Sequence, residues 1–170
     1  LSPVLHHMIA VALDASITHL FEEGIRLHMR AALKLGATRE QLLEVIQIVS
    51  LLGMQSHLVA LPIVIDALGD DDPAKARARR SLGTRDAELK ERFVDRVGVW
   101  GNAHDVMLGL SEDYFPTYME QVSVPYDSGA LTKRERALVL FAANVSITHL
   151  NERAIADSAK AAIVAGCSGD

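Results

Sequence analysis

The sequence predicts an all-α fold, an orthogonal bundle of packed, crossing helices, and three observations support this class. Apolar residues recur at helical spacing over most of the chain, as in QLLEVIQIVSLLG. Residues typical of helix starts and ends flank these segments. No segment combines the alternating pattern of a strand with a hairpin turn pair. With 170 residues, 49% of them hydrophobic, the chain has enough apolar material for a core.

An internal repeat organises the chain. When the sequence is shifted by 130 positions, its first 40 residues align with its last 40 without a gap, and 12 positions are identical. Five of these positions form the unbroken string SITHL. We therefore expect two tandem repeats. The predicted segments are a first repeat at 1–69, a helical connector with an aromatic-rich part at 70–130, and a second repeat at 131–170 that is incomplete in this sequence.

Both copies carry the same helix signals. Ser2 followed by Pro3 is typical of a helix start. Asp14 could cap a second helix that contains SITHL and ends at Gly36, where glycine allows a left-handed exit. The matching signals in the second copy are a capping box at Thr132 and Glu135, a cap at Asn144 and an end at Gly166.

Two more helices are predicted after the first copy of this pair. Thr38 and Gln41 form a capping box, and the apolar helical pattern that follows continues to Gly53. Residues 54–69 form the next helix, and Pro62 within it should kink or split that helix.

The region between the copies differs in composition. Its first part, DDDPAKARARRSLGTRDAELKERF, is highly charged and indicates solvated helix with a break near Gly83. Its second part holds most of the aromatic residues. Trp100 and Tyr118 are candidate substrate-binding residues there, and ordinary core or lid packing is the alternative.

Composition excludes several function classes. A net charge of -5 and a pI near 5.8 predict no attraction to nucleic acid or to an anionic membrane surface. The single cysteine, Cys167, excludes a disulfide framework within one chain and favours a reducing cytoplasm. The sequence contains no run of 18 uninterrupted apolar residues, so it predicts no membrane-spanning helix. The expected partners are small molecules and further copies of the chain.

The candidate chemistry lies in the predicted SITHL helix. His19 is followed by Glu22 one turn later, a spacing at which a carboxylate can orient an imidazole, and His149 and Glu152 repeat it. His19 and Glu22 are therefore candidate catalytic residues, and a solvated or subunit-facing stripe is the alternative. Folding could also gather His19, Glu22 and His149 around a metal, although the histidine spacing itself forms no ligand motif.

His28 is the third candidate catalytic residue. It falls on the apolar side of the same helix, nine residues from His19, where a neutral imidazole could act as a general base. A hydrogen-bonded core histidine is the alternative. One helix points Arg26 and His28 in different directions, so a shared role needs a cleft that wraps around it. The second copy has Ser158 in place of His28, which makes the first copy the one expected to be catalytic.

The segment GIRLHMRAALKLGATREQLLEVIQIVSLLG resembles the carboxymuconolactone decarboxylase family. The decarboxylase branch of that family carries a similar R-L-H-x-R-x-A-L run, followed by G-x-T-R-E-E and a long apolar helix. The resemblance covers residues 1–69, and residues 131–170 as a partial second copy. It implies the orthogonal helical bundle of the alkylhydroperoxidase D-like superfamily. The residues that match the run are Arg26, Leu27, His28, Arg30, Ala32 and Leu33.

The peroxidase branch of this superfamily uses a C-x-x-C motif at the matching helix. Here Ser16 and His19 stand in place of the two cysteines. A serine hydroxyl does not become the thiolate that attacks a peroxide, so thiol peroxidase chemistry is not expected.

The decarboxylase branch implies a cofactor-free, homo-oligomeric lyase that acts by acid/base chemistry on a small carboxylated lactone or a related intermediate of aromatic-compound catabolism. On that model His28 transfers protons, while Arg26 or Arg30 binds a substrate carboxylate. The alternatives are a non-catalytic helical oligomerisation or ligand-binding subunit, and a metal-dependent enzyme that uses the SITHL histidines.

Overall fold

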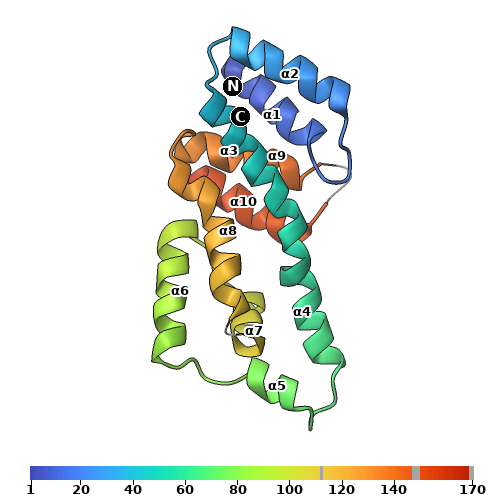
Figure 1. Ribbon diagram of the computed structural model, residues 1–170, viewed down its shortest axis with the longest axis vertical. Coiled ribbons are helices and arrows are strands. Elements are labelled where there is room, and N and C mark those ends of the chain that lie inside the picture. The colour runs from blue at the N-terminus through green and yellow to red at the C-terminus, as the bar shows by residue number, and fades with distance from the viewer. Residues whose placement is uncertain (112, 147–149, 169–170) are drawn as a thin grey trace. The chain divides into compact units, whose positions relative to one another are not determined.

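The computed structural model describes residues 1–111, 113–146 and 150–168, and these residues form helices and no strand (Figure 1). This confirms the all-α prediction. The chain divides into two compact units. The first unit combines Leu1–Gly53 with Ser128–Asp170, and the second is Met54–Asp127. The units differ from the predicted segments, because the two repeat copies pack into one unit, and residues 54–69 group with the connector.

The first unit is built from the helices of both copies and one further helix. Helix α1 packs against α2, α3 and α9, and α9 packs against α10. The apolar faces of α1, α2, α3 and α9 form one core, which includes Met8, Val11, Val45 and Val139. The bounds are α1 Pro3–Asp14, α2 Glu22–Lys34, α3 Arg39–Ser50, α9 Lys133–Asn144 and α10 Glu152–Val164.

The two copies have matching local structure. Helices α9 and α10 begin and end 130 residues after α1 and α2. The side chain of Ser2 caps α1, and Thr132 caps α9 in the predicted capping box. Gly36 and Gly166 have φ angles of 99° and 88°, the left-handed exit that the sequence predicts. This correspondence supports the predicted duplication.

SITHL is not helical in the first copy, which corrects the prediction. Helix α1 ends at Asp14, a turn follows, and α2 begins at Glu22. Leu20 has a φ of 49°, a conformation that a non-glycine residue rarely adopts and that no helix contains. Asp14 does not cap α2. Its backbone carbonyl instead accepts a 2.8 Å hydrogen bond from the N–H of Phe21. In the second copy, residues 147–149 of SITHL lie outside the described residues.

A buried carboxylate joins α3 to the start of α9. Glu44 is fully buried, and its Oε2 accepts hydrogen bonds from Ser128 Oγ at 2.7 Å and from the N–H groups of Ala130 and Leu131 at 3.0 Å. Its Oε1 pairs with the Arg136 guanidinium at 2.7–2.8 Å. This network fixes the chain where the second copy begins.

The second unit contains the helices that follow α3. After a short 3₁₀ turn, Leu51–Met54, helix α4 continues through Pro62 without the predicted split. Gly83 separates α5 from α6, as predicted, and both helices bury one face, including Lys75 and Phe93, rather than being solvated throughout. The bounds are α4 Gln55–Ala67, α5 Pro73–Ala78, α6 Thr84–Val97, α7 Asn102–Leu110 and α8 Tyr114–Ser128.

One helical segment among the described residues, Arg39–Ala67, is long and apolar enough to span a membrane by length and composition. In its most apolar window 22% of the residues are buried. Length and composition do not separate such a segment from a helix that packs against protein.

Asp86 gives the second unit a pH-dependent contact. Its buried carboxylate accepts hydrogen bonds from Arg80 and from the N–H of Gly83. The Arg80 hydrogen bond is the main reason that the pKa of Asp86 lies below its ordinary value of 3.8. Because the folded state favours the charged carboxylate, Asp86 stabilises the fold above the unfolded-state pKa, and this contribution is lost as the pH falls through the folded-state pKa.

We therefore expect Asp86→Asn to lower the thermal midpoint at pH 7, and this deficit to shrink below the ordinary pKa of 3.8. Thermal unfolding between pH 2.5 and 7 would measure it. Asp95→Asn, which alters an exposed carboxyl on the same helix, is the control. A deficit that stays constant with pH would contradict the role given to Asp86.

Candidate active site

Two histidines meet between α1 and α2. The Nδ1 atoms of His7 and His28 lie 2.9 Å apart, and the two ring centroids are 5.1 Å apart. Both side chains are half-buried. The exposed ring of His6 contacts His7 edge to face at 5.5 Å. His28 therefore faces α1, away from solvent as predicted, but its partner is another imidazole rather than a purely apolar surface.

The arginines of the R-L-H-x-R run face the other way. At about 100° per residue, Arg26 and Arg30 lie about 200° from His28 around the axis of α2. Both are exposed, and Arg26 forms an ion pair with Glu22 at 3.2 Å. One α2 helix therefore does not bring either arginine and His28 to the same small substrate. This agrees with the divergence predicted from the sequence.

His19 and Glu22 do not form the predicted pair. Glu22 is exposed and contacts Arg26, whereas the carboxylate nearest to His19 is Asp14, with Nε2 and Oδ1 3.8 Å apart. The pairing fails because His19 lies in the turn before α2 and not on the helix. The His19 ring packs beside Phe21, with centroids 5.7 Å apart.

Asp14 packs directly over Gly24 of α2. A methyl group at Gly24 would lie 2.6 Å from both Asp14 Cγ and Phe21 Cδ1, closer than real contacts allow. The absence of a side chain at Gly24 thus permits the turn that carries His19 to lie close to α2. In the second copy the matching residue is Ala154, whose carbonyl accepts a hydrogen bond from Asn144.

We expect Gly24→Ala to lower the free energy of unfolding by roughly 1 kcal/mol. Overpacking costs about 1–3 kcal/mol, and the gain in helix propensity of about 1 kcal/mol offsets part of it. Urea unfolding would measure the change, with Ala31→Gly as a control for helix propensity on the same helix. A Gly24→Ala protein more stable than the wild type would show that Asp14 and Phe21 move aside freely.

The predicted metal ligands are not assembled in the described part of the chain. His149 lies outside the described residues. Among the residues described, no group of three or more His, Cys, Asp or Glu side chains could hold a metal ion. The place of His28 in the second copy is taken by Ser158, which is buried and bonds to Asn144 and to the Ala154 carbonyl.

The two aromatic candidates belong to an aromatic cluster in the second unit. Tyr118 is 3% exposed, and burial is the main cause that raises the pKa of its phenol above the ordinary value. Trp100 donates a 2.9 Å hydrogen bond from Nε1 to Asp105. The contacts favour the core-packing alternative for both. The cluster joins Phe93, Trp100, His104, Phe115 and Tyr118 at centroid distances of 5.1–6.1 Å.

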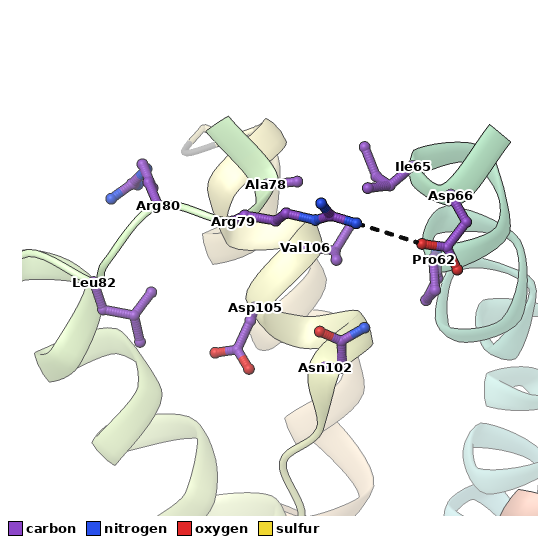
Figure 2. Close-up of a pocket in the computed structure, with 10 residues that line it drawn as sticks. All are labelled: Pro62, Ile65, Asp66, Ala78, Arg79, Arg80, Leu82, Asn102, Asp105 and Val106. Carbon is purple, nitrogen blue, oxygen red and sulfur yellow. Dashed lines mark ion pairs between the residues drawn. The ribbon is translucent and has the colours of Figure 1, made fainter. Parts of the chain in front are cut away.

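A cavity of about 370 Å³ lies in the second unit (Figure 2). The Arg79 side chain extends across it toward Asp66, with the charged groups 3.9 Å apart. Asn102 and Asp105 of α7 line the same cavity, and Trp100 and Tyr118 do not. This site was not predicted, because its residues come from α4, α5, the loop after α5 and α7 and form no motif in the sequence.

His7 is the main functional candidate that the sequence did not single out. It lies 21 positions from His28, and the two histidines share no recognised ligand or catalytic spacing. The helical pattern does hold a signal, since α1 and α2 each turn one apolar face toward the other and each face includes one histidine.

The comparisons with known proteins identify the family of the chain. The model of the carboxymuconolactone decarboxylase family matches residues 1–64. A search of curated proteins finds no match. The chain is similar to the crystal structure of a proposed gamma-carboxymuconolactone decarboxylase subunit from Burkholderia xenovorans LB400, with 30% identity and a TM-score of 0.88. The match covers 99% of this chain and 67% of that one. The chain belongs to the carboxymuconolactone decarboxylase family.

Proposed function

We propose that the protein is a decarboxylase-type lyase, in which His28 performs acid/base chemistry on a small carboxylated lactone. The observation that carries the proposal is the half-buried His28 imidazole, held against α1 by its contact with His7. An imidazole accepts and donates protons near neutral pH, which suits a reaction that ends in proton transfer to carbon. Family membership supports the substrate class.

The reaction balances with one proton. The bond between the ring carbon and the carboxylate breaks and releases CO₂, and its electron pair enters the conjugated lactone as a dienolate. An imidazolium or Nε2–H group then protonates a ring carbon. A general acid contributes about 10²–10⁴-fold to such a step. The proposed enzyme is cofactor-free and cytoplasmic, and it serves the breakdown of aromatic compounds.

A direct assay tests this function. The protein would be incubated with gamma-carboxymuconolactone while CO₂ release and the loss of substrate absorbance are followed. We expect catalysed loss of CO₂ above the rate in buffer. The Glu22→Gln protein is the matched control and should retain this rate, because Glu22 is exposed and pairs with Arg26 on the other side of α2. Decarboxylation no faster than in buffer would overturn the proposal.

We also propose that a second copy covers the outward face of α2 and the turn before it. Large apolar side chains are exposed there, among them Leu20 at 62%, Leu27 at 63% and Leu33 at 50%. Such a surface favours association, and the similar crystal structure is that of a subunit. Sedimentation of Leu27→Asp should show smaller particles than the wild type, and an unchanged size would contradict this interface.

A non-catalytic helical subunit is the second candidate function. The exposed apolar face on α2 favours it, because this surface needs a partner whether or not the protein is an enzyme. The same assay separates the two, since a purely structural subunit releases no CO₂.

A further inference from the structure

We propose that His7 and His28 work as one proton relay, in which His7 is a positioning residue that also passes a proton to or from His28. The inference rests on the proposed function, because it assigns a partner to the imidazole that does the chemistry. It adds a residue from α1 to the proposed site of His28 on α2.

The distance between the rings fixes the number of protons between them. At 2.9 Å the two Nδ1 atoms are in hydrogen-bond contact. Two bare nitrogens would set lone pair against lone pair, and two protonated nitrogens would set N–H against N–H. One proton therefore lies between them, donated by one ring and accepted by the other.

This shared proton makes the two outer nitrogens different. In the neutral pair, the ring that donates from Nδ1 has a bare Nε2, which is a base. The ring that accepts at Nδ1 carries its proton on Nε2, which is an acid. The pair thus offers one acid and one base at the same time, whichever ring holds which role. A lone neutral histidine also carries one N–H and one bare nitrogen, but its Nε2 alone offers only one of the two roles in each tautomer.

The relay balances with the proposed reaction. A solvent proton adds to the bare Nε2 of the first ring, and the shared proton moves from its Nδ1 to the Nδ1 of the second ring. The Nε2 proton of the second ring passes to the dienolate carbon. Both rings end neutral with their roles exchanged, and the solvent proton balances the CO₂ lost from the lactone. Proton exchange with water at the two Nε2 atoms then returns the pair to its starting tautomers.

The second copy supports this assignment by contrast. The residues that match His7 and His28 are Ala137 and Ser158, and both are buried in the unit. The Ser158 hydroxyl instead accepts a hydrogen bond from the Asn144 amide and donates one to the Ala154 carbonyl of its own helix. Helices α9 and α10, which correspond to α1 and α2, thus pack without an imidazole at either position. The fold of the pair does not require the two histidines, and a role in proton transfer accounts for them in the first copy.

The test combines nitrogen NMR with kinetics. ¹⁵N shifts of the imidazoles near neutral pH should show Nδ1–H in one of the two histidines and Nε2–H in the other, with a coupling across the Nδ1–H···Nδ1 bond. In His7→Phe the coupling should vanish and His28 should show the tautomer mixture of a free imidazole. In His7→Asn, the side-chain amide restores a partner for His28 Nδ1 and should restore a single tautomer, although it passes no proton.

Kinetic measurements distinguish a proton-relay role of His7 from a role in packing alone. Both His7 variants should lower kcat at least tenfold with little change in KM, since neither relays a proton. His6→Asn, a change in the neighbouring exposed ring, is the matched control and should leave kcat near the wild-type value. Two neutral rings that both carry their proton on Nε2 would overturn the shared proton, whatever the turnover.

A wild-type kcat in His7→Phe would overturn the relay while leaving decarboxylation by His28 intact. Absence of turnover in the wild type would instead overturn the proposed function and, with it, the catalytic role of the pair. The NMR result then still decides whether the shared proton exists. The two failures are therefore distinguishable.

Discussion

Glu44→Gln should lower the free energy of unfolding by about 3–5 kcal/mol, the largest stability effect that we expect in this chain. The substitution removes the charge that pairs with the buried Arg136 guanidinium and turns an amide N–H₂ toward groups that donate hydrogen bonds. For a chain of this length such a loss corresponds to a thermal midpoint roughly 6–20 °C lower. Thermal and urea unfolding would measure it.

Two companion variants sharpen this prediction. Glu40→Gln changes an exposed carboxylate on the same helix and should leave the midpoint close to the wild type. Glu44→Met combined with Arg136→Met removes both buried charges and should recover part of the loss, but the N–H groups of Ala130 and Leu131 would stay without their acceptor. A Glu44→Gln protein as stable as the wild type would show that the network does not hold the second copy in place.

His28→Asn should lower kcat/KM for decarboxylation by about 10²–10⁴-fold, the largest functional effect that we expect. Asparagine keeps a polar group near His7 but neither accepts nor donates a proton at the substrate. The fold should persist, because the matching position in the second copy is the smaller Ser158. Steady-state kinetics on the folded variant would measure the loss.

Two variants serve as controls for His28→Asn. Glu22→Gln alters an exposed carboxylate in the first turn of α2, about 120° around the helix axis from His28, and His19→Asn alters an exposed imidazole in the preceding turn. Both should retain most of the activity, although the sequence pattern alone made these two residues catalytic candidates. A His28→Asn protein that turns over at the wild-type rate would remove His28 from the mechanism.

Local signals predicted the helix boundaries where a side chain itself makes the cap. The side chains of Ser2, Thr38 and Thr132 each accept a hydrogen bond from the backbone N–H three residues later, as the sequence predicts. The SITHL turn was missed because Leu20 adopts a left-handed φ that leucine disfavours, so no residue there marks a helix break. Close packing of Asp14 and Phe21 on Gly24 accompanies that conformation, and such packing is a tertiary effect that a local pattern does not show.

The candidate site was predicted in part. His28 and its orientation away from Arg26 followed from helical periodicity within α2, and the structure agrees. His7 and the acceptor role of Glu44 depend on which helices pack together. His7 meets His28 only because α1 lies against α2, and Glu44 meets residues more than 80 positions away. Contacts of this kind require the fold and not the local sequence.

A crystal structure with a saturated lactone carboxylate, which cannot form the dienolate and so keeps its carboxylate, would show whether the two histidines form the substrate site. We expect the analogue beside α2, with a ring atom within hydrogen-bond distance of Nε2 of His28 or His7. An analogue bound instead in the cavity lined by Arg79 and Asn102, with both imidazoles untouched, would contradict this expectation.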